Sequence, residues 1–287
     1  MSGVFSAGVL KAFEEPQIFD RVHSVYAVSV GGCNAARFLT KNSELGGWGF
    51  YNVFNGEGFI HKRLVRYYFQ AVRRWVLGRG RIDDLFDFDF FAEVMLHSDI
   101  KIDMEEVLAS GIPFFVKVFC VSQGMPAYVP VVEPHAFEKV LASASATPLI
   151  SRRFVIAGEE FFDGDTIPSD LDVRLAKQHP DKLVVRISNT RESALKELNA
   201  FNFFVVYTLL LYSYGVRLAN RYAREFFKRP FWHRELRRQR NVFTVSSDLF
   251  ISIFSKDAEL LKRGYEHGVS KGKEAAQIIV SLSAADL

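Results

Sequence analysis

Short apolar runs alternate with amphipathic stretches along this chain. The run Val22–Val28 is rich in β-formers and stops at the tetrapeptide Ser29–Gly32, after which Asn34–Lys41 resumes with helix-forming residues. Further apolar runs at Phe114–Val121 and Leu183–Ser188 predict strands, the second of them buried. Strands that alternate with helical stretches are typical of an α/β fold, with helices on both faces of a sheet.

Several weaker signals complete the pattern of elements in the first two thirds of the chain. The stretch Val4–Glu15 predicts a helix that ends before Pro16. A turn at Gln123–Pro126 separates the strand before it from another strand at Ala127–Val132. Two short runs around Ala157-Gly158 predict a hairpin.

The last third of the chain is mainly helical in pattern. Residues 200–240 predict a long helix with a break near Pro230, followed by a short strand at Phe250–Phe254. No linker rich in Gly, Pro or Ser interrupts the chain, so we expect one domain over residues 1–287 with a helical part from about residue 200.

The longest apolar run, Phe203–Tyr214, is shorter than the ~18–20 residues that a membrane-spanning helix needs. It predicts a buried or lid helix. The first residues lack a basic segment followed by a long apolar run, so we expect no secretory signal there.

Composition narrows the class of protein further. With 49% hydrophobic residues the chain can bury a sizeable core. Its 36 Lys and Arg against 33 Asp and Glu leave a net charge of +3, too even for a dedicated nucleic-acid binder. Two cysteines, Cys33 and Cys120, make neither a disulfide framework nor a zinc site, and they fit a reducing compartment.

Ser29 stands between an apolar strand and a helix, in the pentapeptide Ala27–Gly31. A nucleophilic serine needs such a tight strand-to-helix turn, in which small residues at Ala27 and Gly31 let strand and helix approach closely. The helix N-terminus favours developing negative charge, and the amide of Val30 would be one oxyanion donor. The alternative is an ordinary N-cap serine, which is very common.

Asp163 ends a second apolar stretch and is followed by Gly164 and Asp165. Such an aspartate can point into a cleft while the glycine permits an unusual backbone angle. The alternative is a simple Asp-Gly turn, the commonest use of this dipeptide.

Together these motifs resemble those of the patatin-like phospholipases, in particular a bacterial branch of that family. The resemblance rests on three motifs in the right order, Gly3–Leu10, Ala27–Ala35 and Phe162–Asp165. Two spacer stretches agree with it, Ala142–Leu149 shortly before the aspartate and Asp181–Ile187 after it.

The resemblance implies a three-layer α/β/α fold with a mostly parallel central sheet. It implies a lipid acyl hydrolase, a phospholipase or esterase, in which Ser29 attacks the ester carbonyl and forms an acyl-serine intermediate. Asp163 would act directly as the base, and the amides of Val30, Gly3 and Ser2 would form the oxyanion hole. No metal or organic cofactor is implied. A conventional triad is the alternative mechanism, with His179 as its histidine in chain order.

Three departures from the family pattern stand beside this assignment. Ala27 stands where the family's Gly-x-Ser-x-Gly nucleophile elbow has its first glycine, and Asp165 stands where the family has a small residue after the catalytic aspartate. Asp165 either points to solvent or, if it faces the cleft, raises the pKa of Asp163. Matched to the family, Ser2 falls where the glycine-rich loop has arginine, and we expect the preceding strand and most of that loop to lie upstream of Met1. The rival function is therefore a catalytically impaired patatin-like protein that binds lipid or a partner.

Two Arg-rich stretches, 61–81 and 217–240, suggest contact with an anionic membrane surface. The plain alternative is two solvated helix faces, and nucleic-acid binding is not expected because no recognised module is present. We expect a cytoplasmic protein, peripherally associated with membranes. Cys33, four residues after Ser29, is expected to be a small packed helix residue rather than a reactive thiol.

Overall fold

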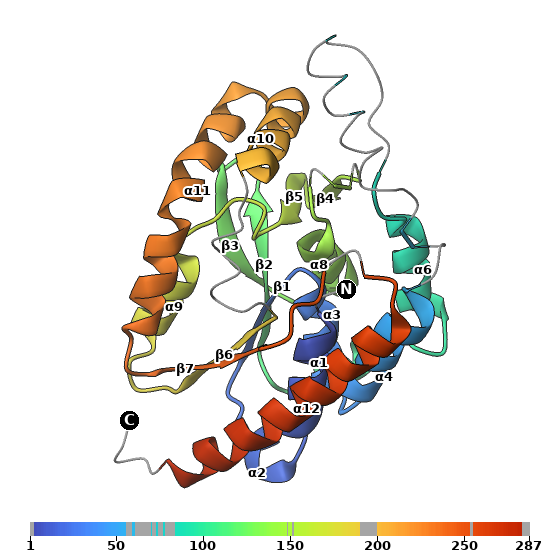
Figure 1. Cartoon of the computed structure of the whole chain (residues 1–287), viewed down its shortest axis with the longest axis vertical. Helices are drawn as coiled ribbons and strands as arrows, with labels where there is room; N and C mark the ends of the chain where they lie inside the picture. The colour runs from blue at the N-terminus through green and yellow to red at the C-terminus, as the bar shows by residue number, and fades with distance from the viewer. Residues whose placement is uncertain are drawn as a thin grey trace.

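The computed structural model of the chain describes residues 3–55, 59–60, 70, 73, 77, 84–147, 149–150, 152–189, 200–252 and 255–282, with the backbone only at 200–202. It is a mixed α/β protein, which confirms the predicted class. Figure 1 shows the strands in the middle of the molecule, with α1, α3 and α12 packed on one side and the α10–α11 pair rising beside the far ends of β2 and β5.

The main sheet has five strands in the order β1-β2-β5-β4, with β3 on the other edge of β2. Its members are β1 (Val25–Val28), β2 (Phe114–Cys120), β3 (Met125–Pro130), β4 (Phe154–Ile156) and β5 (Glu159–Asp163).

The expectation of a mostly parallel sheet is wrong. Only β1 and β2 run parallel in this sheet, whereas β2–β3, β2–β5 and β4–β5 are antiparallel. The reason is local: β2–β3 and β4–β5 are hairpins, and a tight turn can join only antiparallel neighbours. Positive φ angles at Gly124 and at Ala157-Gly158 make those two turns.

One edge of β2 is shared between two strands that approach from opposite directions. The strand β1 pairs with the first half of β2 and ends with Val28 opposite Lys117. The strand β5 pairs with the second half and ends with Asp163 opposite Val118. Because these two partners are neighbours on β2, the ends of β1 and β5 meet at the middle of one edge.

A separate parallel pair is formed by β6 (Val184–Ser188) and β7 (Val242–Ser246). The strand β6 is half-buried along its whole length, not buried as predicted, because it pairs on one edge only within the described residues. The strand β7 replaces the one predicted at Phe250–Phe254: residues 250–252 have no regular structure, and 253–254 lie outside the described residues.

The helices before the β2–β3 hairpin are α1 (Val4–Phe13), α2 (Pro16–Phe19), α3 (Val30–Leu39), α4 (Ser43–Trp48) with the π-helical turn η1 (Gly49–Val53), α6 (Phe88–His97) and α7 (Met104–Ala109). The helix α8 (Ala136–Ala144) lies between the two hairpins. The helices after the β4–β5 hairpin are α9 (Leu171–Gln178), α10 (Ala200–Tyr214), α11 (Val216–Arg237) and α12 (Ala258–Ser281). The predicted helix break near Pro230 is wrong, since α11 continues past that proline. The break lies at Gly215, whose φ of 82° is in the left-handed region that glycine tolerates.

The helices α1 and α12 cross in close contact. Three glycines on one face of α12, at positions 264, 268 and 272, lie against α1, and the middle one meets Gly8 of that helix. A Cβ at Gly268 would lie 2.2 Å from the Phe5 carbonyl oxygen, and one at Gly8 would lie 2.1 Å from the Tyr265 carbonyl oxygen. Only residues without a side chain permit this approach, which holds α1 under the main sheet.

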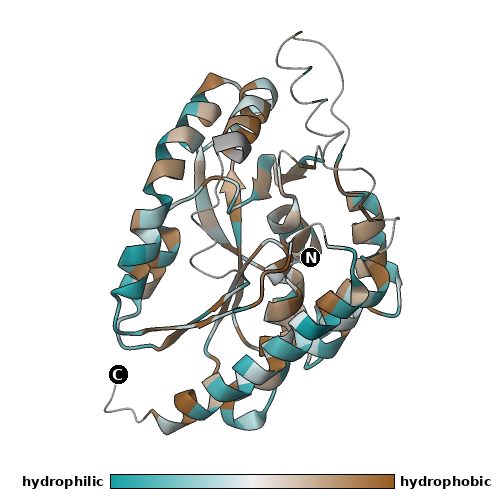
Figure 2. Cartoon of the chain, in the orientation of Figure 1, coloured by the Kyte–Doolittle hydropathy of each residue, from teal (hydrophilic) through white to brown (hydrophobic). Residues whose placement is uncertain are grey.

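The distribution of apolar and polar residues agrees with this arrangement of strands and helices. Figure 2 shows apolar residues concentrated in the strands and in α1, and many hydrophilic residues along α11 and α12. In the described part of the chain, no helix is both long enough and apolar enough to cross a membrane.

Candidate active site

Ser29 occupies the turn between β1 and α3 in a strained conformation. Its φ is 56° and its ψ is −142°, a combination that costs a non-glycine residue of order 1–3 kcal/mol. An ordinary N-cap serine has extended backbone angles and accepts an amide hydrogen bond with its side chain. The Ser29 side chain accepts no such capping bond. The geometry therefore differs from the N-cap alternative and leaves the hydroxyl available to other groups.

The backbone of this turn is held by Ser143, a buried residue of α8. The Ser29 amide donates a hydrogen bond of 3.0 Å to the Ser143 hydroxyl, which in turn donates one of 2.8 Å to the Lys117 carbonyl oxygen. The strained turn is thereby tied to the middle of β2. In the sequence Ser143 stands only in the spacer stretch Ala142–Leu149, and no local pattern predicts this contact.

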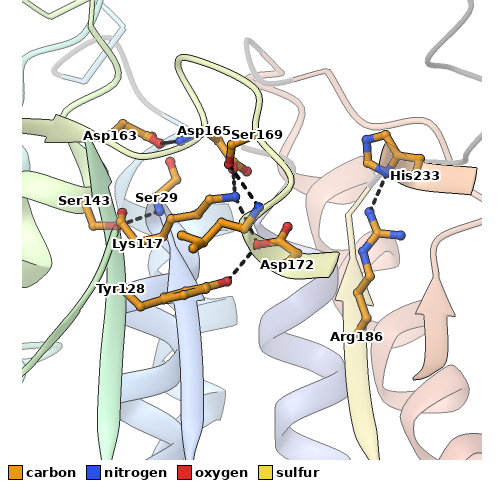
Figure 3. Close-up of polar contacts among 11 residues, drawn as sticks. Ser29, Lys117, Tyr128, Ser143, Asp163, Asp165, Ser169, Asp172, Arg186 and His233 are labelled. Atoms are coloured by element: carbon orange, nitrogen blue, oxygen red, sulfur yellow. Dashed lines mark hydrogen bonds and ion pairs between the residues drawn. The ribbon is translucent and has the colours of Figure 1, made fainter. Parts of the chain in front are cut away.

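Asp163, at the end of β5, is brought against Ser29 by the shared edge of β2. Its side chain is buried, and the Ser29 side chain lies close enough to it to lower its pKa. Figure 3 shows the Ser29 side chain pointing toward the Asp163 carboxylate. The two residues singled out from separate motifs, 134 positions apart along the chain, are thus neighbours.

The Asp-Gly turn, the plain alternative for this motif, is present. The Asp165 amide donates a 2.8 Å hydrogen bond to Asp163 Oδ1. Gly164 is needed for a different reason from the one predicted, because its φ is not in the left-handed region. A Cβ there would lie 2.7 Å from the carbonyl carbon of Lys117, so glycine is required by close approach to β2.

Burial raises the pKa of Asp163 to about 7, and the negative charge of Asp165 adds to the increase. The hydrogen bond from the Asp165 amide, the nearby Ser29 side chain and the positive charge of Lys117 act in the opposite direction. A carboxyl group with a pKa near neutrality can both accept and return a proton, as a general base must.

Asp165 does not simply point to solvent. Its side chain is 49% exposed, yet it forms an ion pair of 2.9 Å with the buried Lys117 ammonium. Although its surroundings desolvate this carboxylate, Lys117 lowers the pKa of Asp165 below its ordinary value. Asp165 is therefore an anion beside Asp163, which is the second of the two roles considered for it.

Lys117 is the hub of a polar network beneath the site. It also pairs with Asp172 at 3.0 Å, and the Tyr128 hydroxyl donates to the same carboxylate at 2.9 Å. Burial by itself lowers the pKa of Lys117, but the two carboxylates raise it above its ordinary value, so the ammonium stays charged. The sequence signal that could have found it is a single lysine within the apolar strand Phe114–Cys120.

Positive charge continues on the other side of Asp165. Arg186 and Arg229 both lower the pKa of Asp165. Arg186 donates a 3.1 Å hydrogen bond to His233 Nδ1, and burial together with these arginines lowers the pKa of His233 to about 4 (Figure 3). His233 is consequently neutral at physiological pH and acts as an acceptor.

The predicted oxyanion donors are placed in part. Val30 is the first residue of α3, so its amide belongs to the turn that a helix leaves without intrahelical partners. Gly3 lies against it, since a Cβ at Gly3 would fall 2.6 Å from Val30 Cγ1. Asn34 of α3 donates a 2.9 Å hydrogen bond to the Gly3 carbonyl and so joins the start of α1 to the nucleophile helix. Ser2 lies outside the described residues.

The small residues on either side of Ser29, Ala27 and Gly31, have different surroundings. Ala27 is paired within β1, opposite Val116. At Gly31, an added Cβ would meet nothing within 4 Å, so the predicted close approach of strand and helix does not occur there. The close contact is at Gly32, where a Cβ would touch Val140 at 3.4 Å.

His179, the histidine of the alternative triad, lies beside Asn241, whose side-chain amide donates to the His179 carbonyl oxygen. No contact of His179 with Ser29 or Asp163 is present within the described ranges.

Cys33 is fully buried, and burial raises the pKa of its thiol to about 11, as expected of a packed residue. The described parts of the chain hold no group of three or more His, Cys, Asp or Glu side chains arranged for a metal ion.

Of the two Arg-rich stretches, 61–81 lies outside the described residues except at positions 70, 73 and 77, while 217–240 coincides largely with α11. No protein-family profile matches this chain, and no curated protein matches it either.

Proposed function

We propose that the chain is a serine hydrolase with a Ser29–Asp163 dyad. The observation that carries the proposal is the strained Ser29, whose side chain points toward a buried carboxyl group with a pKa of about 7. Strain of this kind persists only where the surrounding structure enforces it, and it concentrates at functional sites.

In the first half-reaction, Ser29 Oγ attacks an ester carbonyl carbon while Asp163 takes the hydroxyl proton. The carbonyl oxygen becomes an oxyanion, stabilised by the Val30 amide at the positive end of α3. Collapse of this tetrahedral intermediate breaks the bond to the alcohol, which leaves with the proton from Asp163, and acyl-Ser29 remains.

In the second half-reaction, Asp163 takes a proton from water as the water attacks acyl-Ser29. Collapse of the second tetrahedral intermediate releases the carboxylic acid, and the proton on Asp163 returns to Ser29 Oγ. No metal or organic cofactor is needed, because the same carboxylate serves as base and acid in turn.

The substrate class we propose is the acyl ester of a lipid. It is supported by the resemblance to patatin-like phospholipases and by the apolar setting of the dyad. Phe162 precedes Asp163 and stacks on Phe119 at 4.8 Å, and the cluster around them includes Leu210 of α10 and Tyr222 of α11. We propose a patatin-like α/β/α arrangement for the fold on the same resemblance.

The test is turnover of a short-chain nitrophenyl ester and release of fatty acid from phospholipid. Ser29→Ala and Asp163→Asn should each lower kcat by at least ~10³, as removing the nucleophile or base of such a unit does. Ser270→Ala and Asp20→Asn are matched controls at exposed positions. Turnover that survives in either dyad variant would remove the assigned role.

The alternative is a catalytically impaired protein that binds lipid or a partner. One observation favours it: of the three predicted oxyanion donors, the described residues place only the Val30 amide at the nucleophile itself. A fluorophosphonate probe distinguishes the two, because it labels Ser29 only if the serine is activated. Lipid binding without Ser29-dependent labelling or turnover would establish the alternative.

A further inference from the structure

The outer face of α11 combines exposed aromatic and basic side chains in one helical stripe. We define the outer face by six exposed residues along one side of α11, of which the last five recur at intervals of seven, three or four positions: Val216, Arg217, Arg224, Phe227, Phe231 and Arg234. Phe227 is 72% exposed, Val216 61% and Phe231 50%, although side chains of this kind are usually buried.

The charge on this face is positive and largely uncompensated. Arg217, Arg224 and Arg234 form no ion pair with the described part of the chain. The two acids of α11, Glu225 and Glu235, are only 20% exposed and are paired with Lys228 and Arg238. The outer face therefore presents cations and apolar groups to solvent without an opposing carboxylate.

The inner face of the same helix connects this stripe to the candidate active site. Leu218 and Tyr222 pack in one cluster with Phe119 and Phe162, and Phe162 directly precedes Asp163. Figure 1 shows α11 along one side of the molecule, with α9 and α10 on its inner side. A surface bound to the outer face would thus lie one helix away from the strand that carries the proposed base.

We propose that the outer face of α11 docks the protein on an anionic lipid membrane, with Phe227 and Phe231 entering the interface and the three arginines at the headgroups. Charge complementarity selects this occupant, since each cation near an anionic surface adds attraction and aromatic rings favour the headgroup level. The proposal rests on the proposed function, because it describes how a lipid ester hydrolase would reach its substrate.

A nucleic acid is the other polyanion that could bind a basic surface such as the outer face. The face offers an aliphatic residue at one end, Val216, and the chain as a whole carries a net charge of only +3. Both features favour an apolar, anionic interface over a polyanion in water.

Binding is measured by cosedimentation of the Ser29→Ala protein with vesicles of phosphatidylcholine alone or mixed with phosphatidylserine. The Ser29→Ala protein carries the same surface, so its binding does not depend on catalysis. We expect tighter binding to the mixed vesicles, weakened as salt shortens the Debye length from ~10 Å toward 3 Å.

Two sets of variants locate the surface. Replacing Arg217, Arg224 and Arg234 with glutamine should weaken binding to mixed vesicles by roughly a hundredfold. The matched control removes the same charge from α12, with Lys262→Gln, Arg263→Gln and Lys273→Gln at exposed positions, and should change binding by less than about tenfold.

The aromatic part is tested with Phe227→Ser and Phe231→Ser together, against Phe250→Ser, which is 69% exposed outside the outer face. The double variant should lose at least tenfold in affinity while the control does not, and thermal melts report whether each variant is folded. Equal losses in both charge variants, binding indifferent to lipid charge, or tighter binding to a labelled RNA than to mixed vesicles would each overturn the proposal. Ser29-dependent ester turnover with no vesicle binding would overturn it while leaving the proposed function in place.

Discussion

At the residue scale, the candidate site depends on two carboxylates with opposite environments. Asp163 is buried and its pKa is raised, whereas Asp165 is half exposed, paired with Lys117, and its pKa is lowered. Two neighbouring acids separated in this way can take different roles, one as a proton carrier and the other as a fixed charge.

The fixed charge of Asp165 leads to a prediction for the pH profile. Asp163 must be ionised to act as base, so activity should rise as the pH passes its pKa of about 7. Asp165→Asn removes a negative charge that raises this pKa, so the midpoint of the kcat profile should move to lower pH, by on the order of one unit. Asp172→Asn is the control, since Asp172 also pairs with Lys117 without being a cause of the Asp163 shift. An unchanged midpoint in Asp165→Asn would contradict the electrostatic account.

Burial of Asp163 also has a consequence for stability. Its folded pKa of about 7 is above the ordinary value of 3.8, so between these values the folded state holds a proton that the unfolded state has lost. The free energy of unfolding therefore falls as the pH rises through this window and stays lower above it. Asp163→Asn should remove this cost and raise the free energy of unfolding above pH 7, by at most ~4 kcal/mol.

Urea unfolding at about pH 8 and about pH 5 checks this prediction, because the difference between the two proteins should shrink at the lower pH. Asp20→Asn, at an exposed position, should show no such dependence. A variant less stable than the parent at both pH values would show that the contacts of the Asp163 carboxylate, such as the hydrogen bond from the Asp165 amide, outweigh the burial of its charge.

At the element scale, the site is formed where β1, β5 and α8 meet on β2. Ser143 contributes the contact from α8, and its removal leaves the half-buried amide of Ser29 without this partner. Such an orphaned donor costs about 1–3 kcal/mol. We expect Ser143→Ala to lower kcat by roughly ten- to a hundredfold with a smaller change in KM.

Ser145→Ala is the matched control for that experiment. Ser145 is equally buried on the same segment, but its hydroxyl returns to the Ala142 carbonyl of its own helix. If both variants lose activity alike, the effect belongs to the packing of α8 and not to the hydrogen bond with Ser29.

The crossing of α1 and α12 allows a second prediction at this scale. Gly268→Ala would gain ~1 kcal/mol of helix propensity at an open position. At the crossing, its Cβ would lie 2.2 Å from the Phe5 carbonyl oxygen, and overpacking of this kind costs typically 1–3 kcal/mol. We expect a lower melting temperature for Gly268→Ala and little change for Ser270→Ala on the exposed side of α12; an unchanged melting temperature in both would mean that the helices separate at no cost.

At the scale of the whole molecule, two of the strands with an open edge in the described part of the chain are β1 and β6. Within the described residues, β1 pairs only with β2 and β6 only with β7, and both are half-buried along their length. Unpaired backbone groups are expensive when buried, so a strand added to the edge of β1 would be stabilising.

The resemblance to the patatin-like family predicts such a strand upstream of Met1, followed by glycines whose amides face the oxyanion. We expect a chain extended by the upstream coding sequence to melt at a higher temperature than the 287-residue chain. It should also hydrolyse a nitrophenyl ester faster by ~10²–10³, the usual effect of one oxyanion donor. Equal melting temperatures and equal rates, or upstream codons that encode no such segment, would count against this account of the oxyanion hole.

The sequence by itself determined the elements whose signals are local. The turn after Val28, the hairpin around Ala157-Gly158 and the helix from Val4 follow from short-range periodicity and turn residues, and the structure confirms them. The pairing of Ser29 with Asp163 was proposed from motifs that resemble a family, since no local pattern links residues so far apart. Only the tertiary structure decided the register that sets Val28 and Asp163 against neighbouring residues of β2.

The same distinction explains what the sequence analysis missed. Lys117 and Ser143 have functions only through partners on other strands and helices, and an apolar strand or a small-residue helix gives no local sign of those partners. The mostly parallel sheet was predicted wrongly because strand direction depends on which strands pair. Pairing is a long-range choice made by burial and backbone hydrogen bonding together, and residue patterns along the chain carry little information about it.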